Sequence, residues 1–389
     1  MVELYASVIT GFEAVAIEEI ASKFHVQSTK GRGHVRFEID QRQIPEVLRL
    51  RSVDNLYVVL YDYFLDGLSS AEQKDALEMI VREISRINWK VAVECWETAH
   101  GKCIPGGVDG VKAKMRDFVK NGAVESRAED SFSFRVTCNR AGEKSRHNFS
   151  SMDAARALGG IINRIFGWRP DMENFDMEVL LRLKDETMLV MVSLNRESLF
   201  KRNVCSFGPT TMRSTMCYCL VALAQPRPGD VVLDPMCGGG SIPLEGALAF
   251  PGCLFIGADH HSEAISRCSQ NMQHCSTELS QSGSVVAFMA CDAVELPFSE
   301  SSIDAVVTDL PYGKKIGSVG DNRVLYPRLL VEWARVVKPN GRLVLMTHDK
   351  RSYERALALH GCSWRVASHH FVNVGGLTTL CHCLVNVKS

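Results

Sequence analysis

Four short apolar segments, each followed by an aspartate, constrain the fold of this 389-residue chain more than any other feature. The aspartates are Asp234, Asp259, Asp292 and Asp309. Apolar strands of this length, separated by helix-length segments, are typical of a doubly wound α/β sheet, whose parallel strands end at one edge. The sequence therefore predicts that the residues following these strands gather at a single site.

A glycine loop follows the first of these strands. Residues 235–240 read Pro-Met-Cys-Gly-Gly-Gly, and a helical pattern begins at Ile242. Glycine is expected at Gly238 and Gly240 because a side chain would stop the backbone from closing over a nucleotide-like ligand. The loop has no Lys-Ser/Thr pair, which argues against a P-loop, and Pro243 interrupts the dinucleotide pattern Gly-x-Gly-x-x-Gly. Taken alone, such a loop is at least as often a structural turn as a ligand site.

The fourth strand runs into Asp309-Leu310-Pro311-Tyr312, which resembles the Asp/Asn-Pro-Pro-Tyr/Phe signature of S-adenosylmethionine-dependent amino-methyltransferases. Residues 234–240 are similar to the cofactor loop of the same enzymes. The resemblance implies S-adenosylmethionine as the cofactor, no metal, and a catalytic role for the four signature residues, although Leu310 replaces the commoner proline. It also implies the cofactor-binding residues Asp234, Pro235, Gly238, Gly240, Asp259, Asp292 and Arg213.

The signature suits methylation of a base amine, which is a poor nucleophile because its lone pair is delocalised into the ring. Asp309 and the carbonyl after it would accept hydrogen bonds from the amine and aim the lone pair at the methyl group. Tyr312 would stack on a base taken out of its surroundings, and Asp259 would pair with ribose hydroxyls. The alternative is a plain strand-ending turn, with Pro311 and Gly313 as turn residues.

The first 205 residues show the mixed strand and helix patterns of an α+β fold. Residues 33–39 alternate as a half-buried strand does, and residues 12–24 carry an apolar stripe at helical spacing. The other expected strands are 5–9, 55–64, 90–95, 132–138, 176–184 and 187–194, and the other expected helices are 71–87, 109–121 and 151–166.

Three segments of this half, 134–142, 147–151 and 176–181, resemble the THUMP domain of tRNA-modifying enzymes. The segment before them is similar to the ferredoxin-like domain that accompanies THUMP. The order matches a family of tRNA guanine-N2 methyltransferases, and it implies tRNA as the substrate. The expected domains are ferredoxin-like at 1–88, THUMP at 89–205, and a class I, Rossmann-like methyltransferase at 206–389.

Two other functions fit the same patterns. An enzyme of the same chemistry could act on ribosomal or spliceosomal RNA, since the motifs would be the same. An RNA-binding protein without catalysis is the second alternative, and the four intact aspartates argue against it.

A basic segment between residues 112 and 146 is the expected RNA-binding surface. The net charge of the chain is −1, so attraction to RNA would come from a local basic face rather than from the whole chain. A solvated charged face is the alternative. The predicted RNA contacts are Lys112, Lys114, Arg116, Arg135, Arg140, Lys144 and Arg146.

The third strand of the methyltransferase segment, 284–290, is expected at the free edge of the sheet. It is apolar and contains no Lys or Pro, the residues that commonly protect an edge from pairing. The family resemblance implies a small zinc-binding activator subunit, which would add a strand there and cover Val286 and Phe288. A helix or loop of the same chain is the alternative cover.

The rest of the sequence completes the sheet and suggests a compartment. Residues 326–337 should form a helix, 342–347 a fifth strand, and 370–374 with 378–387 a closing hairpin. No stretch approaches ~18 consecutive apolar residues, so no membrane span is expected. The 14 cysteines are scattered, which favours free thiols over zinc or disulfides. We expect a cytoplasmic protein, and a nuclear fraction is also compatible with the sequence.

Overall fold

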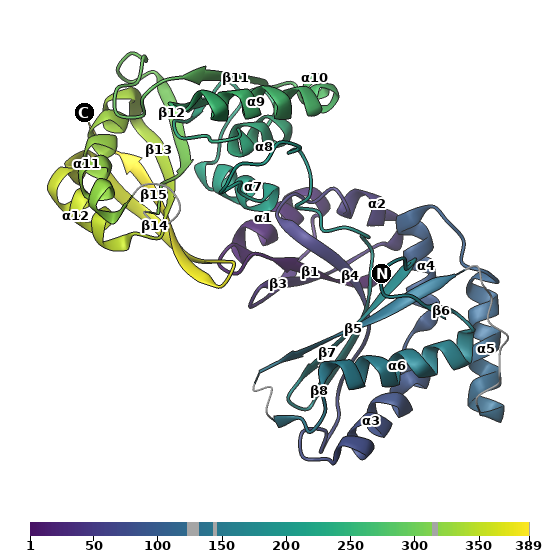
Figure 1. Ribbon diagram of the computed structural model, residues 1–389. Helices are drawn as coiled ribbons and strands as arrows, with labels where there is room; N and C mark the ends of the chain where they lie inside the picture. The colour runs from purple at the N-terminus through teal and green to yellow at the C-terminus, as the bar shows by residue number, and fades with distance from the viewer. Residues whose placement is uncertain (123–131, 143–145, 313–317, 389) are drawn as a thin grey trace.

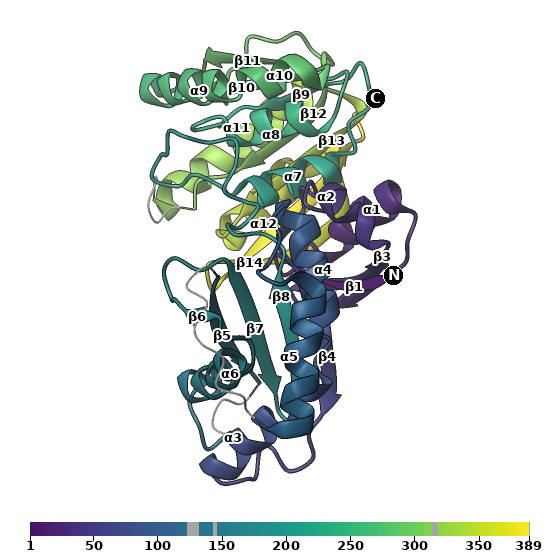
Figure 2. The ribbon, with the colours of Figure 1, turned by 90° about the vertical axis from the view of Figure 1, so that its right-hand side faces the viewer.

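The computed structural model describes residues 1–122, 132–142, 146–312 and 318–388, which fold around an eight-stranded and a seven-stranded sheet (Figure 1). The first half of the chain forms the eight-stranded sheet, and the second half forms the other. The seven-stranded sheet lies above the eight-stranded sheet in Figure 1 and again after the quarter-turn of Figure 2.

The first sheet has the strand order β2-β3-β1-β4-β8-β7-β5-β6. Its strands are β1 Val2–Val8, β2 Ser28–Gly31, β3 His34–Ile39, β4 Val53–Phe64, β5 Ser133–Ala141, β6 Arg169–Pro170, β7 Met177–Lys184 and β8 Thr187–Ser193. The α-helices of this half are α1 Glu13–Phe24, α2 Ile44–Val47, α3 Gln73–Arg82, α4 Trp89–His100, α5 Gly107–Asn121 and α6 Ser151–Phe166. Strand β4 pairs antiparallel with β8, from Tyr57 opposite Ser193 to Phe64 opposite Thr187. The two modules predicted from the sequence therefore share one sheet.

Residues 90–95, predicted as a strand, lie in helix α4. The side chain of Asn88 caps the start of this helix. Trp89, Val93 and Trp96 are buried, and their spacing places them on one face of the helix. The prediction was wrong because a short run of alternating apolar residues also fits a helix that is largely buried.

The second sheet has the order β11-β10-β9-β12-β13-β15-β14. Its strands are β9 Val231–Asp234, β10 Leu254–Asp259, β11 Val285–Ala290, β12 Ile303–Asp309, β13 Val337–Thr347, β14 Trp364–Val374 and β15 Leu377–Asn386. Its helices are α7 Ser214–Ala224, α8 Ser241–Ala249, α9 Ser262–His274, α10 Ser276–Ser282, α11 Val319–Val336 and α12 Lys350–His360. The five neighbouring strands β11, β10, β9, β12 and β13 are parallel. Strand β15 runs antiparallel to both β13 and β14. This confirms the class I fold, with β11 at the free edge as predicted.

The hairpin of β14 and β15 reaches from the second sheet to the loop between β1 and α1 (Figure 1). The backbone N–H of Asn373 donates to the carbonyl oxygen of Thr10 at 3.0 Å. Gly11 lies so close to the hairpin that a Cβ would be 2.2 Å from the carbonyl oxygen of Phe371, and its φ is +107°. Any side chain at position 11 would therefore push the two halves apart.

A buried carboxylate forms a second junction between the halves. Glu245 of α8 accepts hydrogen bonds from Arg51 Nη1 and Arg202 Nη2, each at 2.8 Å, and from the amide of Asn203. Arg51 belongs to the first half, whereas Arg202 and Asn203 lie in the segment that connects the halves. Arg202 Nη2 also donates to the carbonyl of Arg51 at 2.7 Å. One carboxylate thus holds both cations beside the helix that follows the glycine loop.

Candidate active site

The four aspartates predicted from the sequence lie along the carboxyl edge of the second sheet. Asp259, Asp234 and Asp309 end the adjacent strands β10, β9 and β12, and Asp292 follows β11. Parallel strands end on the same side, so the strand order places the four residues in a row. This is the edge where ligands bind in open α/β sheets.

The glycine loop is held against the end of β10. The N–H of Gly238 donates to Asp259 Oδ2 at 3.0 Å, and the N–H of Cys237 donates to the carbonyl of Ala258 at 2.9 Å. Gly238 has φ +56°, and no atom lies near its missing side chain. Gly240 has φ +80°, but a Cβ there would be 2.7 Å from the ring of Phe288. Gly238 therefore leaves open space for a ligand, whereas Gly240 makes room for core packing.

Asp234 connects the loop to the neighbouring strand. Its Oδ1 accepts hydrogen bonds from Thr308 Oγ1 at 2.7 Å and from the N–H of Met236 at 3.2 Å. Burial raises the pKa of Asp234 to about 7, against the effect of the Thr308 hydrogen bond. Both hydrogen bonds are internal to the protein, so the visible role of Asp234 is to fix the loop against β12.

Asp309 is half-buried, and its Oδ1 atom is buried with no hydrogen-bond partner among the residues that the structure describes. Burial raises the pKa of this carboxyl to about 7, although the hydrogen bond from the Tyr312 hydroxyl opposes the shift. An unpartnered buried carboxylate oxygen is costly for the fold alone, so it indicates a position for a donor from outside the chain. A substrate amine supplies such a donor.

The backbone after Asp309 is held by two neighbours. The N–H of Leu310 donates to the carbonyl of Met346 at 3.0 Å. The Tyr326 hydroxyl donates to the carbonyl of Pro311 at 2.6 Å and lies 3.0 Å from Thr347 Oγ1. Tyr326 was missed as a site residue, because its only signal in the sequence is a place in an expected helix. It fixes the turn that carries the signature.

Asp259 and Asp292 are placed to hold an adenosine-containing cofactor. Asp259 Oδ1 accepts the N–H of His261 at 2.9 Å, and each of its oxygens keeps a further lone pair. Asp292 is exposed, and its Oδ1 accepts the N–H of Val294 at 3.1 Å. Together with the open side of Gly238, these acceptors fit S-adenosylmethionine. The role of each residue stays a prediction.

Arg213, predicted to bind the cofactor, faces the N-terminal half. Its guanidinium lies 3.8 Å from Asp54 Oδ2 and 4.5 Å from the centre of the Phe200 ring. The sequence analysis also missed a link between the segment that connects the two halves and the glycine loop. The buried amide of Asn271 accepts from the N–H of Ser206 at 2.8 Å and donates to the carbonyl of Gly239 at 2.8 Å. No motif marks Asn271 in the sequence.

Three of the predicted RNA contacts are engaged inside the protein. Lys114 Nζ donates to the carbonyl of Phe166 at 2.8 Å. Arg135 pairs with Glu178 at 2.9 Å, and Arg140 donates to the carbonyl of Phe149 at 2.5 Å. These contacts stabilise the fold around α6 and β7.

The other predicted RNA contacts differ in accessibility. Lys112 and Arg116 are exposed and lie one turn apart on α5. Arg146 is exposed and lies 3.3 Å from Asp185. Lys144 lies outside the described residues. The exposed pair on α5 is therefore the part of the basic segment best placed to meet RNA phosphates.

Two family models match the chain. Residues 202–379 match the RMKL-like methyltransferase domain, and residues 111–193 match the THUMP domain. The tRNA (guanine(6)-N(2))-methyltransferase THUMP3 of Mus musculus is 35% identical over 97% of this chain and 87% of its own length. The human THUMP3 is 34% identical over 99% of this chain and 88% of its own length. This chain belongs to the THUMP3 methyltransferase family.

The family assignment agrees with the fold seen in a solved structure. The crystal structure of TrmN from Thermus thermophilus matches 99% of this chain and 100% of its own, with a TM-score of 0.74 and 22% identity. At that identity the similarity shows a shared fold. Like the rest of its family, the chain is thus a methyltransferase with a THUMP domain. No helix in the described part of the chain is long and apolar enough to cross a membrane.

Proposed function

We propose that this chain transfers a methyl group from S-adenosylmethionine to the exocyclic N2 amine of guanosine at position 6 of tRNA. The observation that carries the proposal is the buried Asp309 Oδ1 at the carboxyl edge of a class I sheet, which has no partner within the described part of the chain. The names of the THUMP3 relatives supply the base, the position and the RNA. The THUMP domain supports a tRNA substrate.

The residues of this chain orient the amine and its surroundings. Asp309 Oδ1 would accept one amine proton and the carbonyl of Leu310 the other, which directs the nitrogen lone pair away from the ring. Tyr312 would stack on the base, and Tyr326 would keep the turn in place through Pro311. When bound, the cofactor supplies a methyl group that its sulfonium already activates. Asp259, Asp292 and Gly238 would hold it.

The test is methylation of defined RNAs by the purified chain, alone and with an activator subunit, followed by mass spectrometry of the nucleosides. We expect N2-methylguanosine in a tRNA transcript with guanosine at position 6, and none when that guanosine is replaced. Asp309→Ala, which removes the acceptor oxygen, serves as the inactive control. Methylation of spliceosomal or ribosomal RNA instead of tRNA would contradict the proposed substrate, and full activity of Asp309→Ala would contradict the proposed site.

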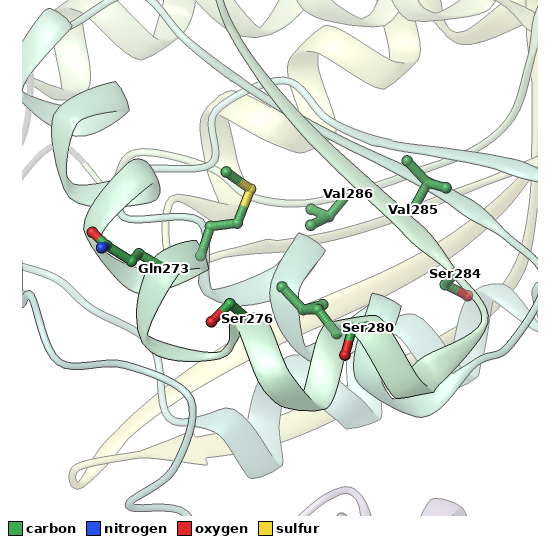
Figure 3. A pocket seen from close by; sticks show the side chains of 8 residues that line it. Gln273, Ser276, Ser280, Ser284, Val285 and Val286 are labelled. Atoms are coloured by element: carbon green, nitrogen blue, oxygen red, sulfur yellow. The ribbon is translucent and has the colours of Figure 1, made fainter.

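We also propose that a small zinc-binding activator subunit pairs with β11. Val285 is 63% exposed, and a groove of about 550 Å³ lies between this strand and helices α9 and α10 (Figure 3). Met272, Leu279 and Val286 are among its apolar lining residues. The Phe288 ring packs inward against Gly240 and Gly257, whereas Val286 lines the groove. Of these two residues, Val286 is therefore the better placed to contact a partner.

The hydrogen-bonding pattern of β11 decides which residue to change. The N–H of Val285 donates to the carbonyl of Cys253, just before β10, and the N–H of Cys291 donates to the carbonyl of Asp259 at the end of β10. Because alternate residues face opposite sides, Val286 presents its N–H outward, where a partner strand would accept it. Val286→Pro removes that donor and leaves the pairing with β10 intact. We expect it to prevent co-purification of the activator, whereas the matched control Val286→Thr keeps the donor and binding. Equal binding by both variants would reject this edge as the contact.

A further inference from the structure

A second groove lies where the hairpin of β14 and β15 meets the N-terminal half. It has a volume of about 450 Å³, and its lining includes Thr10, Lys30, Arg32 and Phe371. Lys30 lies in β2 and Arg32 lies in the turn between β2 and β3. Both are exposed, and neither forms an ion pair with any residue that the structure describes. Within the described part of the chain, the groove therefore presents two cations that are not held in ion pairs.

An aromatic ring stands at the hairpin side of this groove. The side chain of Phe371 is 58% exposed, although it is large and apolar. The ammonium of Lys350 lies 5.2 Å from the centre of the ring, and His369 packs edge-on against it at 5.7 Å. Cations beside an exposed aromatic ring form the combination that binds nucleic acid strands, because phosphates meet the charges while a base stacks on the ring.

The groove is prebuilt rather than loosely arranged. Glu13, its one acidic lining residue, is buried and accepts the N–H of Gly11 at 3.0 Å and the N–H of Gly33 at 2.8 Å. Its carboxylate is therefore occupied in fixing the two loops that flank the groove. The contact of Gly11 with Phe371 holds the hairpin against the same loops. A strand bound here would meet a surface that needs little rearrangement.

The groove lies close to the catalytic edge. Asp309 is opposite Met346, Met346 is opposite Cys381, and Cys381 is opposite His370. Phe371 is one residue further toward the carboxyl edge, so its height along the sheet matches that of the catalytic signature. Three strand spacings separate β12 from β14, which corresponds to roughly 14 Å. A ligand that fills the catalytic site can extend to the groove within a few nucleotides.

We infer that this groove binds the RNA strand next to the target guanosine, with Lys30 and Arg32 contacting phosphates and Phe371 stacking on a base. The inference rests on the proposed function, because it takes the RNA to be the methylated tRNA. It assigns RNA binding to a surface outside the basic segment 112–146. The hairpin would then guide the strand from the N-terminal half into the catalytic site.

The test compares two paired substitutions in the full-length chain. Lys30→Ala with Arg32→Ala removes the two groove cations. Arg42→Ala with Arg49→Ala is the matched control, since both residues are exposed cations around α2. Affinity for the tRNA transcript is measured as a function of salt, and affinity for S-adenosylmethionine is measured by calorimetry. We expect the groove variant to lower the salt slope by about one for each lost contact, and the control to leave it unchanged.

Phe371 provides an independent arm of the same test. Phe371→Ala should weaken tRNA binding roughly tenfold, whereas Phe371→Trp keeps a stacking ring and should bind normally. Cofactor affinity should not change in any variant, which shows that the proteins are folded.

The outcomes separate this inference from the proposed function. A wild-type chain that neither binds nor methylates tRNA overturns both. A wild-type chain that methylates tRNA while the groove variants bind it as tightly as the Arg42/Arg49 control overturns the groove alone. Groove variants that bind tRNA normally but lose the activator subunit would make the groove a protein contact, which also overturns the inference.

Discussion

Replacing Glu245 tests whether the junction between the two halves depends on one buried charge. The Glu245 side chain is completely buried, whereas the side chains of Arg51 and Arg202 are 24% and 20% exposed. Glu245→Gln keeps the size of the side chain and one acceptor oxygen but removes the charge. Two guanidinium groups with little access to water would then lack a counter-ion.

The expected loss follows from that geometry. Removing one partner of a buried ion pair costs about 3–5 kcal/mol, because the remaining charge stays desolvated. The partial exposure of both arginines and the acceptor kept by glutamine place Glu245→Gln at the lower end, about 3 kcal/mol. The exposed pair of Arg49 and Glu46 provides the scale for a surface interaction, since removing it should change stability by less than about 1 kcal/mol.

Urea unfolding followed by tryptophan fluorescence and circular dichroism measures this loss. We expect the midpoint of Glu245→Gln to fall well below that of wild type, and Arg49→Met to remain close to wild type. Because Glu245 joins the halves, the two signals should coincide in wild type and separate in the variant. Calorimetry with S-adenosylmethionine should also show weaker binding, since α8 follows the glycine loop.

A triple variant that removes all three charges separates the effect of an unpaired charge from the effect of changed packing. Arg51→Met, Arg202→Met and Glu245→Leu together replace the charges with apolar side chains, and such replacements of buried ion pairs are often neutral or stabilising. We therefore expect the triple variant to regain most of the stability that Glu245→Gln loses. Stability of Glu245→Gln within about 1 kcal/mol of wild type would refute the idea that the carboxylate neutralises buried charge.

Five further predictions concern the active site and the RNA-binding surface. Asp309→Ala removes the acceptor oxygen and should lower kcat by at least about a hundredfold while leaving S-adenosylmethionine affinity within a few fold, which single-turnover assays and calorimetry separate. Burial raises the pKa of Asp309 to about 7, so kcat/KM should rise as the pH increases through about 7 and the accepting carboxylate forms. A flat profile from pH 6 to 8 would contradict this. The same raised pKa stabilises the folded chain most below pH ~4, and this contribution is lost as the pH rises from there through about 7. Tyr312→Phe removes the hydrogen bond that lowers the pKa of Asp309 and should move the profile to higher pH, while Tyr312→Ala should also lose ~1–3 kcal/mol of stacking, measured as weaker tRNA binding. Asp259→Ala should weaken cofactor binding by ~1.5–3 kcal/mol, and unchanged affinity in calorimetry would reject its pairing with the ribose. Lys112→Ala with Arg116→Ala should reduce the salt slope of tRNA binding by about two, and an unchanged slope would remove α5 from the RNA surface.

The strand ends could be predicted because neighbouring residues in the sequence are enough to mark them. Each short apolar run before an aspartate has few ways to fold, and the parallel order then brings Asp234, Asp259 and Asp309 to one edge. The free edge at β11 was predictable for the same reason, since it follows from the class of fold. The segment 90–95 was not, because its short apolar alternation fits two secondary structures and only packing decides between them.

Long-range partners account for most of what the sequence could not show. Arg135 looks like a free cation in the sequence, but Glu178 lies opposite it on the paired strand β7. Asn271 looks like an ordinary helix residue, but its amide joins the connecting segment to the glycine loop. In both cases the contact depends on residues far away in the chain. Local patterns therefore predict where functional groups lie better than they predict what holds them.

The pairing of β4 with β8 has a consequence for the order of folding during synthesis. Strand β4 ends at Phe64, and its partner begins at Thr187, about 120 residues later, which takes roughly 6–24 s to translate. Over that interval β4 has an unpaired edge, and β1 to β3 have no continuation of their sheet. Such an edge can pair with neighbouring nascent chains. Expression yield should therefore depend on how quickly the ribosome reaches β8, and slow translation between these strands should increase aggregation.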